Sequence, residues 1–301
     1  MSSSSTPRSL CSFGVFLGIL LICFAKPLFQ LAQFAIKSTL YSHVVLIPFI
    51  SAYFIRQQWK ERRIIKTGRS LSGVLPFALG AGLLLLMFFA KGALSRADSL
   101  SILTAAFVLW LVAGGLFFLG SERMRSIAFP VGMLFFMVPF PSAVEKWIEI
   151  FFQHTSAGAA AGLFALTNTP VYRDGLLFNL PGISIRVAEE CSGIHSSLVL
   201  FITGLIAGQL FLRSPFTRAF LALVVVPLGI IRNGFRIFTI GMLCVHVSPS
   251  MMDSPIHHRG GPIFFALSLI PFFLILIWLR RRENSRARDL IGQTIKPAIQ
   301  I

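Results

Sequence analysis

The chain has few charged residues, and acidic residues are scarcest. Only 13% of its 301 residues are charged, and 11 Asp and Glu stand against 27 Lys and Arg, so the formal net charge is +16. Together with 55% hydrophobic residues, this composition excludes an ordinary soluble protein and predicts a polytopic membrane protein. No basic and aromatic groove or binding motif accompanies the positive charge, so we expect no nucleic-acid partner.

Cysteine is also scarce. The four cysteines, Cys11, Cys23, Cys191 and Cys244, lack the paired spacing of a zinc site or of a small disulfide framework.

No cleavage site of a secretory signal precedes Lys26, so we expect the first apolar run to remain as a helix. A long internal repeat, a linker and a second, soluble domain are all lacking.

Apolar runs are abundant, and eight of them approach the length that crosses a bilayer. They are Leu10–Ala25, Ser42–Ile55, Leu71–Ala90, Ser101–Leu119, Ile127–Phe140, Ile194–Leu212, Ala219–Ile231 and Pro262–Leu279. We therefore expect an all-α polytopic membrane protein with about eight transmembrane helices.

Basic clusters orient these helices. They lie at residues 56–69, 123–125, 213–218 and 280–288, after the second, fourth, sixth and eighth runs. The positive-inside rule places all four clusters, and both termini, in the cytoplasm, as expected for a protein of the cytoplasmic (inner) membrane. Cys191, Arg236 and His257 then lie together at the extracytoplasmic face.

The segment before Cys191 predicts structure outside the bilayer core. Glu145–Leu166 is apolar and helical in pattern, but counting it as a span would reverse every later assignment of orientation, so we expect a short interfacial or re-entrant helix. Short alternating runs at Val171–Phe178 and Ile183–Val187, separated by Pro and Gly, predict a small β-ribbon.

Cys191 precedes a long apolar helix. The unpaired N–H groups of a helix start favour an anion and lower the pKa of a thiol, while Glu189 and Glu190 oppose this effect. From its position alone, a cysteine here is either a structural residue or a nucleophile.

Arg236 and the pair His257–His258 could complete a site. Arg236 ends an apolar run, where a cation either snorkels to the surface or serves a function. Asn233 lies three residues earlier on the same helix face. Either histidine could shuttle protons, or the pair could bind a metal, but the helical HExxH motif is absent and we expect neither metal nor cofactor. A thiol, a cation and an imidazole on one face suggest acyl transfer.

Three motifs resemble the exosortase/archaeosortase family. They are EECSG at Glu189–Gly193, RNGFR at Arg232–Arg236 with an N-x-x-R pattern, and HHRGG at His257–Gly261. Their order and their separations of roughly 45 and 21 residues also agree with the family. The resemblance divides the chain into N-terminal membrane helices (1–126), a catalytic membrane domain (127–282) and a basic cytoplasmic tail (283–301).

The resemblance implies a membrane cysteine protease and transpeptidase, which cleaves C-terminal sorting signals of exported proteins through a thioacyl intermediate. Cys191 would be the nucleophile, Arg236 the stabiliser of the thiolate or transition state, and His257 the general acid/base. His258 is the alternative to His257. Further supporting candidates are Asn233, Glu190, Ser192 and Gly193. The chain departs from the family at Glu190, where alanine is common, and at His195, where arginine is common.

The resemblance also implies partners. These are exported proteins that end in a short motif, a membrane helix and a basic tail, together with membrane lipids and an acceptor, either water or an envelope amine or hydroxyl. Two other functions stay open at this stage. One is a transporter or a lipid- or polysaccharide-handling protein that binds anions through Arg236 and the histidines. The other is a structural subunit of an export or polysaccharide complex.

Overall fold

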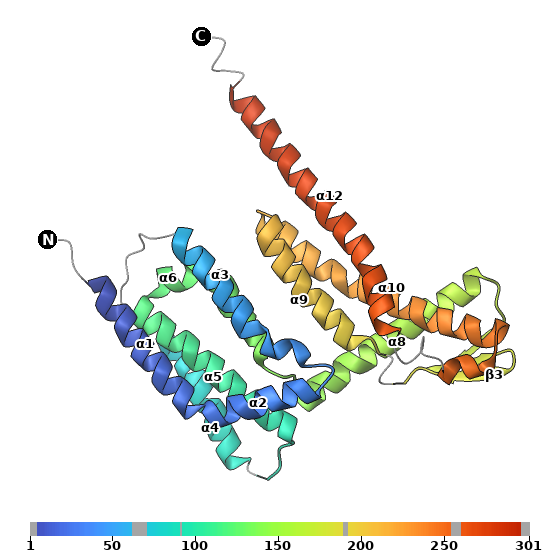
Figure 1. Ribbon diagram of the computed structural model, residues 1–301, viewed down its shortest axis with the longest axis horizontal. Coiled ribbons are helices and arrows are strands. Elements are labelled where there is room, and N and C mark those ends of the chain that lie inside the picture. Colours follow the sequence, from blue (N-terminus) through green and yellow to red (C-terminus); the bar gives the residue numbers. More distant parts are fainter. Residues whose placement is uncertain (1–4, 62–70, 91, 189–191, 254–259, 296–301) are drawn as a thin grey trace. The chain divides into compact units, whose positions relative to one another are not determined.

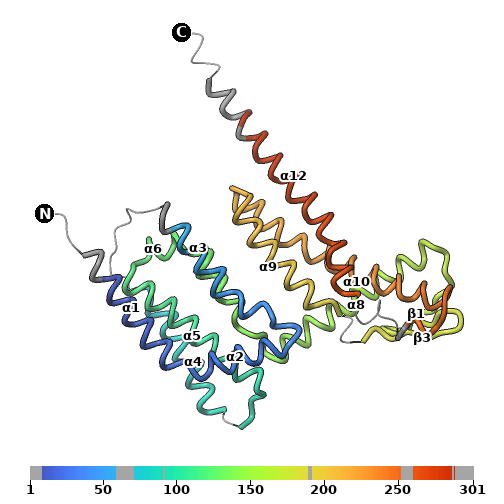
Figure 2. The backbone as a smooth tube through the Cα atoms, viewed as in Figure 1, coloured from blue at the N-terminus to red at the C-terminus, as the bar shows by residue number. Residues whose placement is uncertain are grey.

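The computed structural model describes residues 5–61, 71–90, 92–188, 192–253 and 260–295 (Figure 2). The chain separates into two compact units, residues 1–145 and 146–301, each of which is described by itself. The finer division expected at residues 126 and 282 stays a prediction.

The first unit is a set of helices. Its elements are α1 (Ser5–Cys23), α2 (Ala25–Lys37), η1 (Ser42–Val45), α3 (Ile47–Glu61), η2 (Leu71–Gly73), α4 (Val74–Phe89), α5 (Arg96–Leu119), α6 (Ser121–Ser126), α7 (Ala128–Met133), η3 (Leu134–Met137) and the first residues of α8 (Ser142–Leu166). Helix α5 packs against α4 and α1 (Figure 1).

Polar side chains at the start of α5 also fix the start of α8. The hydroxyl of Ser95 caps α5 by accepting from the backbone N–H of Asp98 at 3.0 Å, and the Asp98 carboxylate accepts from the backbone N–H of Ser142 at 2.7 Å. The Tyr41 hydroxyl donates to Glu145 at 2.8 Å. Burial, and then Glu145, raise the pKa of Tyr41, so this hydroxyl stays protonated and keeps its donor role.

The second unit combines helices with a small sheet. It holds most of α8, then β1 (Tyr172–Asp174), β2 (Leu177–Leu180), β3 (Ile183–Arg186), α9 (Ile194–Phe211), α10 (Pro215–His246), η5 (Pro249–Asp253) and α12 (Gly261–Ile295). Helices α9 and α10 lie side by side, and α12 packs on α10 (Figure 1).

The three strands form an antiparallel sheet in the order β1-β2-β3, which confirms the predicted β-ribbon. Two tight turns contain Gly175 and Gly182, with φ of 57° and 81°, a region that glycine enters without a Cβ penalty. The turn at Gly175 separates β1 from β2 within the first alternating run.

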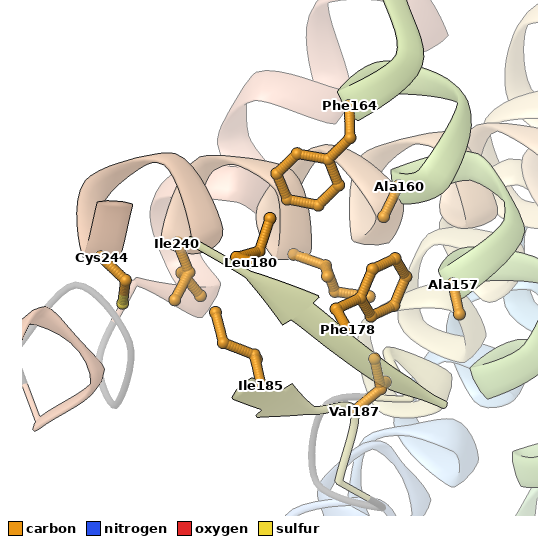
Figure 3. Close-up of a cluster of buried hydrophobic side chains, with 10 residues drawn as sticks. Ala157, Ala160, Phe164, Phe178, Leu180, Ile185, Val187, Ile240 and Cys244 are labelled. Atoms are coloured by element: carbon orange, nitrogen blue, oxygen red, sulfur yellow. The ribbon is translucent and has the colours of Figure 1, made fainter. Parts of the chain in front are cut away.

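One face of the sheet forms a core with two helices (Figure 3). Phe178 of β2 is 1% exposed and its ring lies 5.9 Å from that of Phe164 on α8, while Ile240 and Cys244 come from the last turns of α10. Burial alternates along β2, as a strand with one covered face requires. Cys244 is thus a core residue of this unit.

Several helices are long and apolar enough to cross a membrane. Among the residues that the structure describes, five qualify singly, and up to seven if each of two bent helix pairs counts as one span. The prediction of a many-helix membrane protein is confirmed, whereas the number eight and the interfacial position of residues 145–166 stay predictions. The run 42–55 is divided between η1 and the 15-residue α3.

Helix α10 is much longer than the run Ala219–Ile231 from which it was predicted. Its 32 residues span about 48 Å at about 1.5 Å per residue, against about 30 Å for the hydrocarbon core. The apolar run 219–231 covers only part of the helix. The later turns, which carry Ile240 and Cys244, pack against the sheet.

Small residues allow α8 and α10 to cross closely. A Cβ placed on Gly234 would lie 2.6 Å from Ala159 Cβ and 3.1 Å from the Ser156 carbonyl oxygen. A Cβ on Gly241 would lie 2.6 Å from the ring of Phe164. Small residues at such a crossing let two helix backbones approach.

We expect Gly234→Ala to lower the thermal unfolding midpoint of the detergent-solubilised protein, because the added methyl overpacks the crossing at a cost of about 1–3 kcal/mol. Gly162→Ala on exposed α8 surface is the matched control, since its Cβ would meet nothing within 4 Å. That substitution should raise the midpoint slightly through helix propensity. Equal midpoints for the two variants would contradict the close crossing.

Candidate functional site

The predicted site residues divide into two groups. Cys191, Glu190, His257 and His258 lie outside the described residues, as does Glu189. The structure describes Ser192, Gly193, Asn233 and Arg236, and brings the first three of these together.

The start of α9 is held against α10 by Asn233. The Asn233 side-chain amide donates to the Ser192 carbonyl at 3.1 Å, and both residues are 2% exposed. Gly193 has φ of 75°, and a Cβ there would lie 2.8 Å from Asn233 Cγ. Glycine is therefore required at 193 both by the left-handed backbone and by the approach of Asn233.

Arg232 makes a second connection between the same helices. Its Nη2 donates to the Gly193 carbonyl at 3.3 Å and to the Ser197 hydroxyl at 3.4 Å, and the residue is 7% exposed. Its Nη1 is buried without a hydrogen-bond partner in the part of the chain that the structure describes. The guanidinium thus has donor capacity left for a further acceptor.

Two arginines of α10 and the first turn of α9 contribute positive charge near the start of α9, while Glu189 and Glu190 of the preceding segment carry the opposite charge. Arg236 lies one turn beyond Arg232 on α10 and is half-buried. The first N–H groups of α9 add the positive end of its helix dipole. Two cations and a helix start together favour a negatively charged group at this place.

The segment between the sheet and α9 is fixed on both sides. Before it, Val187 donates its backbone N–H to the Leu176 carbonyl at 3.0 Å and packs into the sheet core at 3% exposed (Figure 3). After it, Ser192 is held by Asn233. The residues numbered 188–191 therefore connect two firmly packed points.

Sequence reasoning assigned no role in the site to three polar groups, of which His195 was named only as a departure from the family pattern. Arg232 was seen only as part of a motif, although its spacing of four from Arg236 places both on one helix face. Ser197 follows Gly193 by four residues, and Gly229 admits its hydroxyl, since a Cβ on Gly229 would lie 2.5 Å from Ser197 Oγ. Nδ1 of His195 is buried without a hydrogen-bond partner among the described residues. Only the spacings could have pointed to the first two.

The described residues contain no group of three His, Cys, Asp or Glu side chains that could hold a metal ion. His257 and His258 lie outside the residues searched. Cys244, which lies near them in the sequence, is 2% exposed in the sheet core.

Comparison with known families shows the family to which the chain belongs. A transmembrane exosortase family profile matches residues 35–274, a range that includes all three motifs. The chain belongs to the transmembrane exosortase family. Together with its long apolar helices, this makes it a multi-pass membrane protein. No curated protein and no solved structure gives a significant match to the chain.

Replacement of Gly193 by alanine should destabilise this exosortase more than the same change at Gly182. Both glycines have positive φ, which costs alanine about 1–2 kcal/mol, but a Cβ on Gly182 would meet nothing within 4 Å. The clash with Asn233 adds about 1–3 kcal/mol at Gly193 alone. Thermal unfolding midpoints in detergent measure the difference. If both variants lose the same stability, the tight contact with Asn233 is wrong.

Proposed function

We propose that this exosortase is a membrane cysteine protease and transpeptidase that cleaves C-terminal sorting signals of exported proteins. The observation that carries the proposal is the match to the exosortase family over a range that contains Cys191, Arg236 and His257. The geometry at the start of α9 supports it, because the cation of Arg232 and the helix start contribute the kind of positive charge that stabilises a thiolate.

The peptide bond to Ser192 ties Cys191 to the start of α9. Cys191 is bonded to Ser192, so their Cα atoms are about 3.8 Å apart. Along α9 the chain runs from Ser197 back to Ser192, while its contacts on α10 run from Arg232 to Asn233. Arg236 lies about 4.5 Å beyond Asn233 along the axis of α10. The proposal assigns Arg236 as the cation that acts on Cys191.

Each group has a defined task in the proposed reaction. The Cys191 thiolate attacks the scissile carbonyl, and Arg236 stabilises the oxyanion that forms. The tetrahedral intermediate then breaks its C–N bond, and His257 protonates the amine of the departing signal. A thioester on Cys191 remains. Water, or an amine or hydroxyl of an envelope component, attacks that thioester and releases the thiol.

The length of α10 supports a site at the extracytoplasmic face. Arg218 lies in its first turns and donates to the Leu212 carbonyl at the turn from α9, on the side that the positive-inside rule assigns to the cytoplasm. Arg236 lies 18 residues further, about 27 Å along the axis, which is close to the hydrocarbon thickness. The active site then faces the outer side of the cytoplasmic membrane, where exported proteins arrive.

We expect Cys191→Ala to abolish cleavage of an exported protein that ends in a short motif, a membrane helix and a basic tail. Without the thiolate no thioester can form. Gel mobility of the co-expressed substrate gives the readout. Cys23→Ala, at an exposed cysteine in the other unit, is the matched control and should process the substrate normally.

Cys191→Ser separates this proposal from a transporter. A serine keeps the size and hydrogen bonding of the side chain, so an anion transporter would keep its function, whereas the protease should lose processing. Processing by Cys191→Ala at the wild-type rate would exclude the cysteine mechanism.

Substitution by lysine should have different effects at Arg236 and at Arg232. At Arg236, lysine lacks the planar fork that fits an oxyanion, so we expect the processing rate to fall by about 10²–10³-fold with a normal amount of protein. At Arg232, lysine loses the contacts to Gly193 and Ser197, so the thermal unfolding midpoint should fall as well. Pulse-chase labelling measures the rate, and detergent melting measures the stability. A normal rate in Arg236→Lys would contradict the assigned role.

A further inference from the structure

An apolar groove lies between the first turns of α10 and the later turns of α12. Its volume is about 190 Å³, and its lining includes Phe216, Phe220, Trp278, Leu279, Arg282 and Arg286. The groove belongs to the second unit and lies at the opposite end of α10 from the sheet core.

Two helix faces build this groove. Phe216 and Phe220 are four residues apart on α10, and Trp278, Arg282 and Arg286 follow one another at the same spacing on α12. Phe216 is 78% exposed and Trp278 is 52% exposed. Tryptophan beside arginine is typical of the boundary between hydrocarbon and headgroups. The groove therefore crosses that boundary, with aromatic rings on one side and guanidinium groups on the other.

The arginines of the groove are available to an anion. Arg282 lies over the ring of Trp278 at 5.3 Å, and both Arg282 and Arg286 are exposed. The Glu283 carboxylate also lines the groove, but it is held by the turn before α10, where it accepts from the backbone N–H groups of Arg213 and Ser214 at 2.9 Å each. It also accepts from the Thr217 hydroxyl.

The size of the groove points to part of a long ligand. Pockets that enclose a whole small molecule measure about 300–1,000 Å³, and this groove is smaller. A ligand with an apolar chain and an anionic head would place a segment of the chain against the aromatic rings and leave the remainder in the bilayer. Guanidinium groups suit a phosphate head because they offer paired donors to its oxygens.

We propose that this groove is a binding site for an anionic glycerophospholipid of the surrounding leaflet. One acyl chain lies against Phe216, Phe220 and Trp278, and the phosphate binds Arg282 and Arg286. The lipid bridges α10 and α12. The positive-inside rule places the groove in the cytoplasmic leaflet, where anionic headgroups attract juxtamembrane arginines. The proposal stands independently of the proposed catalysis, because it uses none of the catalytic candidates.

The test is titration of the purified full-length protein in neutral detergent with phosphatidylglycerol, with bound lipid measured by native mass spectrometry. Arg282→Gln/Arg286→Gln should weaken binding about 20- to 30-fold, since each arginine near the surface contributes about five-fold. Arg281→Gln/Arg288→Gln is the matched control. Its arginines are exposed, lie seven residues apart on another face of α12 and remove the same charge at a similar depth.

We expect the control pair to bind phosphatidylglycerol like the wild type, and phosphatidylethanolamine with the same chains to bind more weakly to both. Equal loss in the two double variants would overturn the site, because it would show diffuse attraction to the whole basic tail. Displacement of the lipid by water-soluble glycerol 3-phosphate at equal concentration would also overturn it, since the acyl chain would then contribute nothing. Binding of both lipids with equal affinity would refute the preference for a head of net negative charge, because the phosphate is common to both lipids.

Discussion

The contact of Asn233 with the backbone of Ser192 and Gly193 is the constraint on which the site depends. It fixes the start of α9 against the middle of α10, and it requires both a glycine and a buried amide. Arg232 connects the same two places through the Gly193 carbonyl. Because both contacts are made to backbone carbonyls, they fix the main chain at Ser192 and Gly193, the residues that follow Cys191 in the sequence. A catalytic thiol needs that kind of positioning.

The fold around this contact serves to hold α10 in one place. Helix α8 crosses it at Gly234, α9 packs along it at Gly229, and the sheet covers its last turns at Ile240. Gly229 and Ile240 are eleven residues apart, about three turns, so α9 and the sheet meet nearly the same face of α10 at different heights, whereas Gly234 turns another face to α8. In the bilayer, where apolar burial does not distinguish protein from lipid, such close packing of small residues is what keeps helices together.

Much of this arrangement follows from the sequence, for identifiable reasons. Composition and apolar runs predict a many-helix membrane protein, and alternation predicts the ribbon, because both signals are periodic and local. The extent of α10 was not predictable from hydropathy, because its last turns are covered by the sheet, a contact between distant segments. The number of spans is uncertain from sequence for a related reason: short helices such as α3 and bent pairs carry the same hydropathy as straight spans. Motifs identified Asn233 and Arg236, but the role of Arg232 depends on a backbone carbonyl, which no side-chain pattern reveals.

Helix α10 carries contacts for three different neighbours within a single unbroken stretch, from Gly229 to Cys244. One residue inserted just after Arg232 would rotate the rest of the helix by about 100° and shift it by about 1.5 Å along the axis. The glycine that meets α8 and the side chains that meet the sheet would then face the wrong neighbours while Arg232 stayed in place. Changes in chain length can therefore accumulate in the turns that flank this helix, whereas its interior is fixed in length as well as in composition.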